Sequence, residues 1–107
     1  MKYPVTQHNN YAVLQLTGEI DLSESPHARK QILSHIKNKN NLLVDLSRVE
    51  YIDSSGVASL VEGFQTARTE QLEFALVGVS VSAMQVLQLA RLDSVFTIYD
   101  SLDDVKE

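Results

Sequence analysis

The sequence predicts an α/β domain in which helices pack on one face of a small mixed β-sheet. Two short apolar runs, residues 42–46 and 74–77, have the composition of strands that are covered on both faces. Between these runs the apolar residues recur at helical spacing, at Val57, Leu60, Val61, Phe64 and Ala67. Each helix between two strands supplies the right-handed crossover that parallel pairing needs.

A β-hairpin is predicted at the start of the chain. Residues 3–7 and 11–17 are typical of two strands joined at Asn9 and Asn10, because asparagine tolerates the left-handed dihedrals of a tight turn. Pro4 cannot donate a ladder hydrogen bond, so we expect the first strand at an edge of the sheet.

The hairpin is followed by a predicted loop and the first helix. Residues 18–21 interrupt the alternation and indicate a connecting loop. Ser25 and Pro26 are typical of an N-cap and a first helical residue. The apolar stripe expected to be buried consists of Ala28, Ile32, Leu33 and Ile36.

The middle of the chain predicts a buried strand, a turn and a second helix. The strand covers residues 42–46 and a short crossing segment covers 47–52. Residues 53–56, Asp-Ser-Ser-Gly, form a turn and cap, and the helical pattern starts at Val57.

The last third predicts two strands and two helices. Residues 74–77 form a strand that ends at Gly78, and residues 95–99 form the last strand. Ser80 or Ser82 caps the helix between them. Its inner stripe is expected to contain Ala83, Met84, Leu87 and Ala90. A short terminal helix over 101–106 completes the order β-β-α-β-α-β-α-β-α, and residues 1–107 form one domain.

Composition excludes several classes of function. The chain has 14 acidic and 9 basic residues and a net charge of −5, which argues against nucleic acid or an anionic membrane as main partner. It has no cysteine, and therefore no disulfide or thiolate metal site. No apolar run approaches membrane-spanning length, and the N-terminus lacks the apolar core of a signal peptide. We expect a cytoplasmic protein without a cofactor or direct membrane insertion.

The turn at residues 53–56 allows two interpretations. Aspartate, serine and glycine before a helix are explained by simple capping. Alternatively, one hydroxyl accepts a phosphate, whose charge would lie beside free backbone N–H groups and the positive end of the helix dipole. Asp53 either orients that hydroxyl for a kinase or caps the helix.

An enzymatic role is the least favoured hypothesis. A nucleophilic serine needs a base, and the histidines are His8, His27 and His35. No G-x-S-x-G elbow accompanies Ser54 or Ser55, and the histidine spacing matches no standard metal site. We therefore expect no catalytic residue and no metal ligand.

Four segments, in this order and spacing, resemble the STAS domain family, named for sulphate transporters and anti-sigma factor antagonists. They are Gly-Glu-Ile-Asp at 18–21, Leu-Val-Asp-Leu-Ser at 43–47, Tyr-Ile-Asp-Ser-Ser-Gly-Val at 51–57 and Leu-Ala-Arg-Leu-Asp-Ser-Val-Phe at 89–96. The resemblance covers nearly the whole chain. Val57 and Ala58 replace the commoner Leu-Gly of the family.

Within the family the chain looks most like the stand-alone bacterial anti-sigma factor antagonists, which act in partner switching. The resemblance implies binding to an anti-sigma factor that is also a serine kinase, phosphorylation at Ser54, and resetting by a metal-dependent serine/threonine phosphatase. The positions implied in partner binding are Asp21, Asp53, Ser54, Ser55 and Gly56. Binding is expected to use the Asp21 loop, the turn and the exposed side of the second helix. The alternative is the STAS subunit of a phospholipid-trafficking ABC transporter, which docks on its ATPase.

Overall fold

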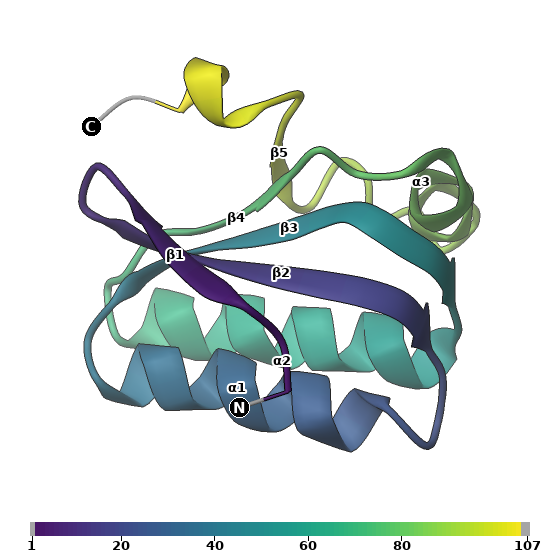
Figure 1. Ribbon diagram of the computed structural model, residues 1–107, viewed down its shortest axis with the longest axis horizontal. Coiled ribbons are helices and arrows are strands. Elements are labelled where there is room, and N and C mark those ends of the chain that lie inside the picture. Colours follow the sequence, from purple (N-terminus) through teal and green to yellow (C-terminus); the bar gives the residue numbers. More distant parts are fainter. Residues whose placement is uncertain (1, 106–107) are drawn as a thin grey trace.

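Five strands form one mixed sheet in the computed structural model, which describes residues 2–105 (Figure 1). The strands are β1 (Val5–His8), β2 (Tyr11–Ile20), β3 (Asn41–Ile52), β4 (Phe74–Val77) and β5 (Thr97–Tyr99). Their spatial order is their order in the chain. β1 pairs antiparallel with β2, and every later pair is parallel. The predicted edge position of the first strand is confirmed, and Asn9 has the left-handed φ of 53° that the hairpin turn requires.

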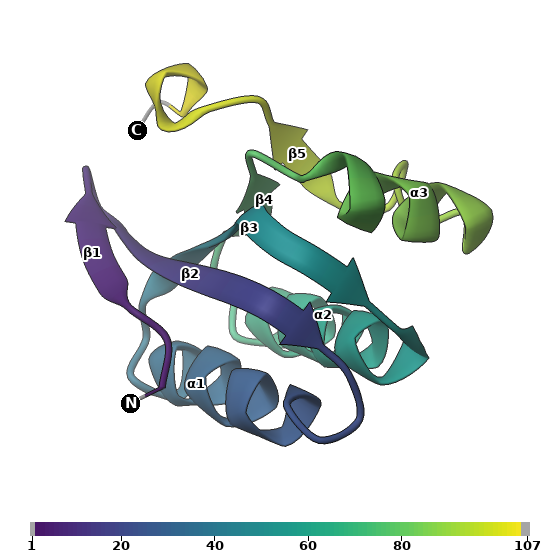
Figure 2. The same cartoon turned by 45° about the vertical axis from the view of Figure 1, so that its right-hand side comes forward.

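Three α-helices connect the parallel strands. They are α1 (Ser25–Lys37), α2 (Ser54–Thr69) and α3 (Val81–Leu89). Helices α1 and α2 lie side by side under one face of the sheet (Figures 1 and 2). Buried Ala83 and Leu87 of α3 belong to the same apolar core as the inward residues of α1 and α2. The predicted fold class is therefore confirmed.

Residues 102–105 pack on the opposite face of the sheet. A 3₁₀ turn, Leu102–Asp104, replaces the predicted terminal helix, of which Lys106 lies outside the described residues. Val105 and Leu102 contact a second apolar cluster that includes Val13 and Leu43. The predicted last strand is also shorter than expected, because β5 begins at Thr97.

The long strands β2 and β3 correct two predictions. Residues 18–20 and 47–52 belong to strands, and the pairing continues until Ile20 lies opposite Ile52. The register shifts between Gln15 and Thr17 and again between Gly18 and Glu19. Each shift places one extra residue in β3, so its inward residues change from a spacing of two to Leu46, Val49 and Ile52, and local periodicity no longer indicates a strand. In β2 the period of two is kept, and the loop was indicated by Gly18, whose φ is 76°, and by the polar residues that follow it.

The helix boundaries differ from the prediction in detail. Glu24 is the N-cap of α1, so Ser25 is already helical and Pro26 is its second residue. Helix α2 begins at Ser54, three residues before the apolar pattern starts. Ser80 is the cap of α3, and its Oγ accepts from the Ala83 N–H at 3.2 Å.

Two residues of the predicted inner stripes, Leu33 and Met84, are only half-buried, and Ala90 is exposed.

Each of the three α-helices is followed, after its C-cap, by a non-glycine residue in the left-handed region. These residues are Lys39, Gln71 and Arg91, with φ of 64°, 61° and 59°. In each case the N–H of this residue and the N–H of the next one donate to carbonyls of the last helical turn, as Gln71 does to Arg68 and Leu72 to Ala67. This is the Schellman arrangement, in which glycine is the usual residue.

Candidate functional site

The carboxyl ends of β2 and β3 bring two acidic turns together. Asp21 follows Ile20 and Asp53 follows Ile52, and these isoleucines are register partners. The Asp53 N–H donates to the Ile20 carbonyl at 3.3 Å, which joins the two turns directly. The bulged extension of the strands thus carries Asp21 to the N-terminus of α2.

Asp53 is the N-cap of α2. Its Oδ1 accepts from the backbone N–H groups of Ser55 at 2.9 Å and Gly56 at 3.2 Å, and from the Ser55 hydroxyl at 2.5 Å. The Ser55 hydroxyl, with the N–H groups of Gly56, Ser55 and Leu22, holds the pKa of this carboxyl below its usual range. Asp53 is therefore ionised at neutral pH, and it supplies the cap that a helix start requires.

The two serines of the turn have different surroundings. Ser54 is the first residue of α2 and is exposed. Ser55 is half-buried, and its hydroxyl donates to Asp53. Within residues 2–105, no hydrogen bond is found for the Ser54 hydroxyl, so of the two it is the one open to a reagent from outside.

Asp21 organises the neighbouring turn in the same manner. Its Oδ1 accepts from the N–H and hydroxyl of Ser23, at 3.0 and 2.7 Å, and from the Glu24 N–H at 3.1 Å. The Ser23 hydroxyl lowers the pKa of Asp21 most, while the negative charge of Asp53 acts in the opposite direction. The site therefore presents two carboxylates that lie close enough for the charge of Asp53 to act on the pKa of Asp21.

Gly56 has a packing role at this site. A Cβ at this position would lie 2.6 Å from the Ile52 Cγ1 and 2.8 Å from the Ile20 carbonyl oxygen. The absence of a side chain lets the first turn of α2 approach the ends of both strands.

Two exposed apolar side chains flank the turns, and the sequence prediction missed both. Leu22 is 75% exposed and Tyr51 is 50% exposed. An apolar residue inside the polar run Asp-Leu-Ser at 21–23 was the available signal for Leu22. Tyr51 lies opposite Glu19 on the face of the sheet away from the helices. Its outward direction could not be predicted from the sequence, because the bulges change which residues of β3 point inward.

A shallow groove borders the first turn of α2. It has a volume of about 390 Å³ and runs between the N-terminal halves of α1 and α2. Its lining includes Pro26, Ser55, Ala58 and the ion pair of Arg29 with Glu62. The exposed side of α2 is thus continuous with the turn.

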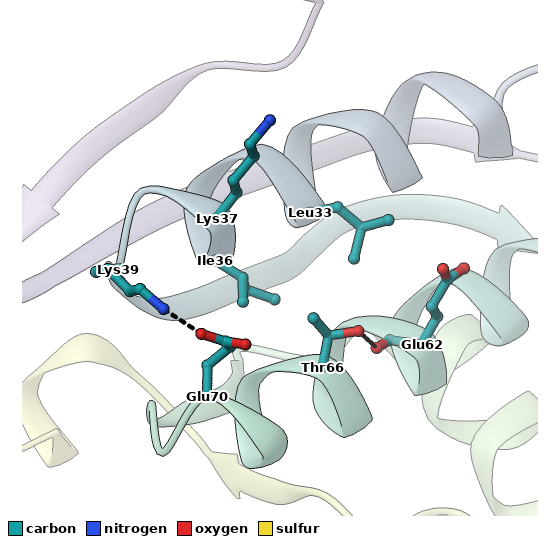
Figure 3. A pocket seen from close by; sticks show the side chains of 7 residues that line it. All are labelled: Leu33, Ile36, Lys37, Lys39, Glu62, Thr66 and Glu70. Atoms are coloured by element: carbon teal, nitrogen blue, oxygen red, sulfur yellow. Dashed lines mark hydrogen bonds and ion pairs between the residues drawn. The ribbon is translucent and has the colours of Figure 1, made fainter.

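A second groove, of about 450 Å³, lies between the C-terminal halves of the same helices (Figure 3). Leu33, Ile36 and Thr66 line it, and Lys39 pairs with Glu70 across it. Its lining includes no residue of the two acidic turns, so we do not assign it to the candidate site.

In residues 2–105, no group of three histidine, cysteine, aspartate or glutamate side chains could hold a metal ion. Within the same range no hydrogen bond links a histidine to Ser54 or Ser55. The arrangement is that of an exposed hydroxyl on a capped helix, between two carboxylates and two exposed apolar side chains.

Comparison with known proteins places this arrangement in a family. The STAS domain model matches residues 2–105. The chain belongs to the STAS domain family. Relatives in the family include the anti-sigma-F factor antagonist RsfB of Mycobacterium tuberculosis, 30% identical over 101 residues, which are 94% of this chain and 82% of RsfB. The anti-sigma-B factor antagonist of Listeria monocytogenes is 29% identical over 84 residues, covering 78% of this chain and 74% of that protein.

Solved structures in the STAS family agree with the fold. The crystal structure of an anti-sigma factor antagonist from Mycobacterium paratuberculosis superposes with a TM-score of 0.83 and 28% identity, over 96% of this chain and 88% of that one. None of the helices in residues 2–105 of this STAS domain has the length and apolar character needed to cross a membrane.

Proposed function

We propose that this protein is an anti-sigma factor antagonist, a non-enzymatic regulator that binds an anti-sigma factor and is switched by phosphorylation of Ser54. The observation that carries the proposal is the exposed, unbonded hydroxyl of Ser54 on the first residue of α2. The names of the similar proteins, anti-sigma-F and anti-sigma-B factor antagonists, support this partner class over the ATPase of a transporter.

The docking face in this proposal consists of the two turns and the adjoining side of α2. Leu22 and Tyr51 supply exposed apolar area, and Asp21 and Asp53 supply fixed charge. Apolar contacts at the centre of a patch with polar groups around them are typical of transient protein interfaces. The partner is an anti-sigma factor with serine kinase activity, and a metal-dependent phosphatase reverses the modification.

Phosphorylation would change the charge of this face. A phosphate adds about −1.5 to −2 charges at neutral pH. The N-terminus of α2 tolerates that charge, but a partner that fits the unmodified turn would have to desolvate a dianion beside Asp53. A loss of about 2.7 kcal/mol in binding free energy lowers affinity about a hundredfold.

Mass spectrometry tests the modified residue. Incubation with the cognate kinase and ATP is expected to add one phosphate to the wild-type chain and to Ser55→Ala, and none to Ser54→Ala. Full modification of Ser54→Ala would show that the acceptor is another residue.

A binding titration tests the charge mechanism. Ser54→Asp is expected to fold normally and to bind the anti-sigma factor much more weakly than the wild type. Ser82→Asp is a matched control, because Ser82 is an exposed serine in the first turn of α3. Equal affinity of the wild type and Ser54→Asp contradicts the mechanism, and capture of a transporter ATPase in place of an anti-sigma factor favours the alternative function.

A further inference from the structure

A polar pocket beside the Asp21 turn has no role in the proposed switch. It has a volume of about 410 Å³ and lies beside the second half of β2, beyond Leu14, where pairing with β1 stops. Its lining consists of Lys2, Tyr3, Thr17, Glu19, Asp21, Ser23 and Glu24. The volume falls in the range of small-molecule sites.

Tyr3 gives the first indication of a ligand. The residue is only 3% exposed, and its hydroxyl has no hydrogen-bond partner among residues 2–105. The backbone of Tyr3 is fixed by the buried Gln31 side chain, which accepts from its N–H at 2.8 Å and donates to its carbonyl at 3.0 Å. A buried hydroxyl without a partner is unusual in a native protein and needs an explanation.

The charges of the lining indicate which ligand fits. Three carboxylates, from Glu19, Asp21 and Glu24, face one cation, Lys2. All hydrogen bonds found for the Asp21 side chain fall on Oδ1, which leaves Oδ2 as a further acceptor. The pocket therefore has a surplus of negative charge and of acceptors.

The pocket lies beside a part of β2 that β1 does not cover. Pairing with β1 ends at Leu14, and the Gln15 N–H donates to the Pro4 carbonyl. β2 continues to Ile20 beyond this pairing, so Thr17 and Glu19, which line the pocket, lie in the part of the strand that β1 does not reach. No strand covers that edge in the described part of the chain.

The ammonium group of Lys2 is a cation that already contacts the lining of the pocket. Its ammonium lies 2.7 Å from Glu24 Oε1 and 6.0 Å from the centre of the Tyr3 ring. The Lys2 side chain is 47% exposed, so it occupies only the outer part of the pocket. Burial and the charge of Glu24 raise the pKa of Tyr3, so that its hydroxyl stays protonated and neutral.

We propose that this pocket binds a small organic cation, a molecule with a guanidinium or primary ammonium group on an aliphatic chain. The cationic group would donate to the free Oδ2 of Asp21 and take the place of the Lys2 ammonium beside Glu24, and the Tyr3 hydroxyl would become paired. A metal ion is a poor occupant, because no group of three acidic or histidine side chains in residues 2–105 has the geometry to hold one. The proposal does not depend on Ser54, since Ser54 does not line the pocket.

Calorimetric titration with agmatine, and with putrescine as the ammonium analogue, tests the proposal at low ionic strength. Saturable binding with one site is expected for at least one of them. Tyr3→Phe should weaken binding about 2- to 10-fold, as expected for one neutral hydrogen bond. Glu24→Gln should weaken it about 10- to 100-fold, as expected for a charged one.

Two further variants distinguish binding at a specific site from non-specific electrostatic attraction to an acidic surface. Lys2→Ala removes the competing ammonium and should tighten binding about 2- to 5-fold. Glu50→Gln removes the same charge as Glu24→Gln from an exposed position outside the pocket and should change affinity less than about twofold. Absence of saturable binding in the millimolar range, or equal losses in Glu24→Gln and Glu50→Gln, would overturn the proposal. Circular dichroism of each variant checks that the fold is retained.

Discussion

Replacing Gly56 by alanine is expected to destabilise the protein by about 1–2 kcal/mol, although alanine is the better helix former. The added Cβ would lie 2.8 Å from the Ile20 carbonyl oxygen and 2.6 Å from Ile52 Cγ1. The carbonyl oxygen belongs to the backbone of Ile20, which pairs with Ile52 of β3, and it accepts from the Asp53 N–H, so it cannot rotate away as a side chain can.

The magnitude follows from the displacement that the contact requires. Ordinary contact begins at 3.4 Å, so the first turn of α2 has to move away from Ile20 by about 0.6 Å. Overpacking of this kind costs about 1–3 kcal/mol, and the helix preference of alanine returns at most about 1 kcal/mol. For a domain of this size the expected decrease in melting temperature is roughly 4–15 °C.

Urea unfolding followed by circular dichroism measures the effect. Ala58→Gly is the matched control, because Ala58 is exposed in the same part of α2 and reports helix preference alone, a loss of at most about 1 kcal/mol. A Gly56→Ala protein as stable as the wild type, or more stable, refutes the reasoning that close approach requires glycine here.

Three further predictions concern the cap, the helix ends and the N-terminal segment. The pKa of Asp53 is lower in the folded protein than in the unfolded chain, where it is about 4. The ionised carboxylate therefore stabilises the fold above about pH 4, and this stabilisation is lost as the pH falls through the folded pKa. The free energy of unfolding of Asp53→Asn should depend less on pH below about 4 than that of the wild type. Gln71→Gly is expected to stabilise the fold by about 0.5–1 kcal/mol in urea unfolding, because residue 71 has a φ of 61°; a loss of stability would mean that the side chain contributes more than the strain costs. Gln31→Leu should destabilise by about 1–3 kcal/mol, since it leaves the buried N–H and carbonyl of Tyr3 unpaired, and an unchanged urea midpoint would contradict this account.

The sequence predicted the elements of this fold well and their ends less well. Apolar runs at 42–46 and 74–77 and the helical spacing after Val57 are strong local signals, and each corresponds to an element of the structure. The second half of β3 was missed because two bulges change which of its side chains point inward, and the end of β2 was missed because Gly18 and the polar residues around it are typical of a loop. Bulges depend on the pairing of strands that are distant in sequence, which local periodicity does not report.

The residues of the candidate site could be named from the sequence, but the division of tasks among them could not. Asp53, Ser54 and Ser55 were all compatible with a cap. The structure assigns the cap to Asp53 and leaves Ser54 exposed, and this distinction depends on side-chain directions at a helix start. The contribution of Leu22 and Tyr51 needed three-dimensional information, because exposure follows from what the rest of the chain fails to cover.

The assignment of the cap to Asp53 rather than Ser54 separates folding from the regulation that we propose for this turn. The start of α2 keeps its hydrogen-bond acceptor whatever chemical group residue 54 carries. Substitution or covalent modification at residue 54 is therefore free to alter recognition while the domain remains intact. The same independence allows the affinity for a partner to be tuned, during evolution or by design, without selecting again for a stable core.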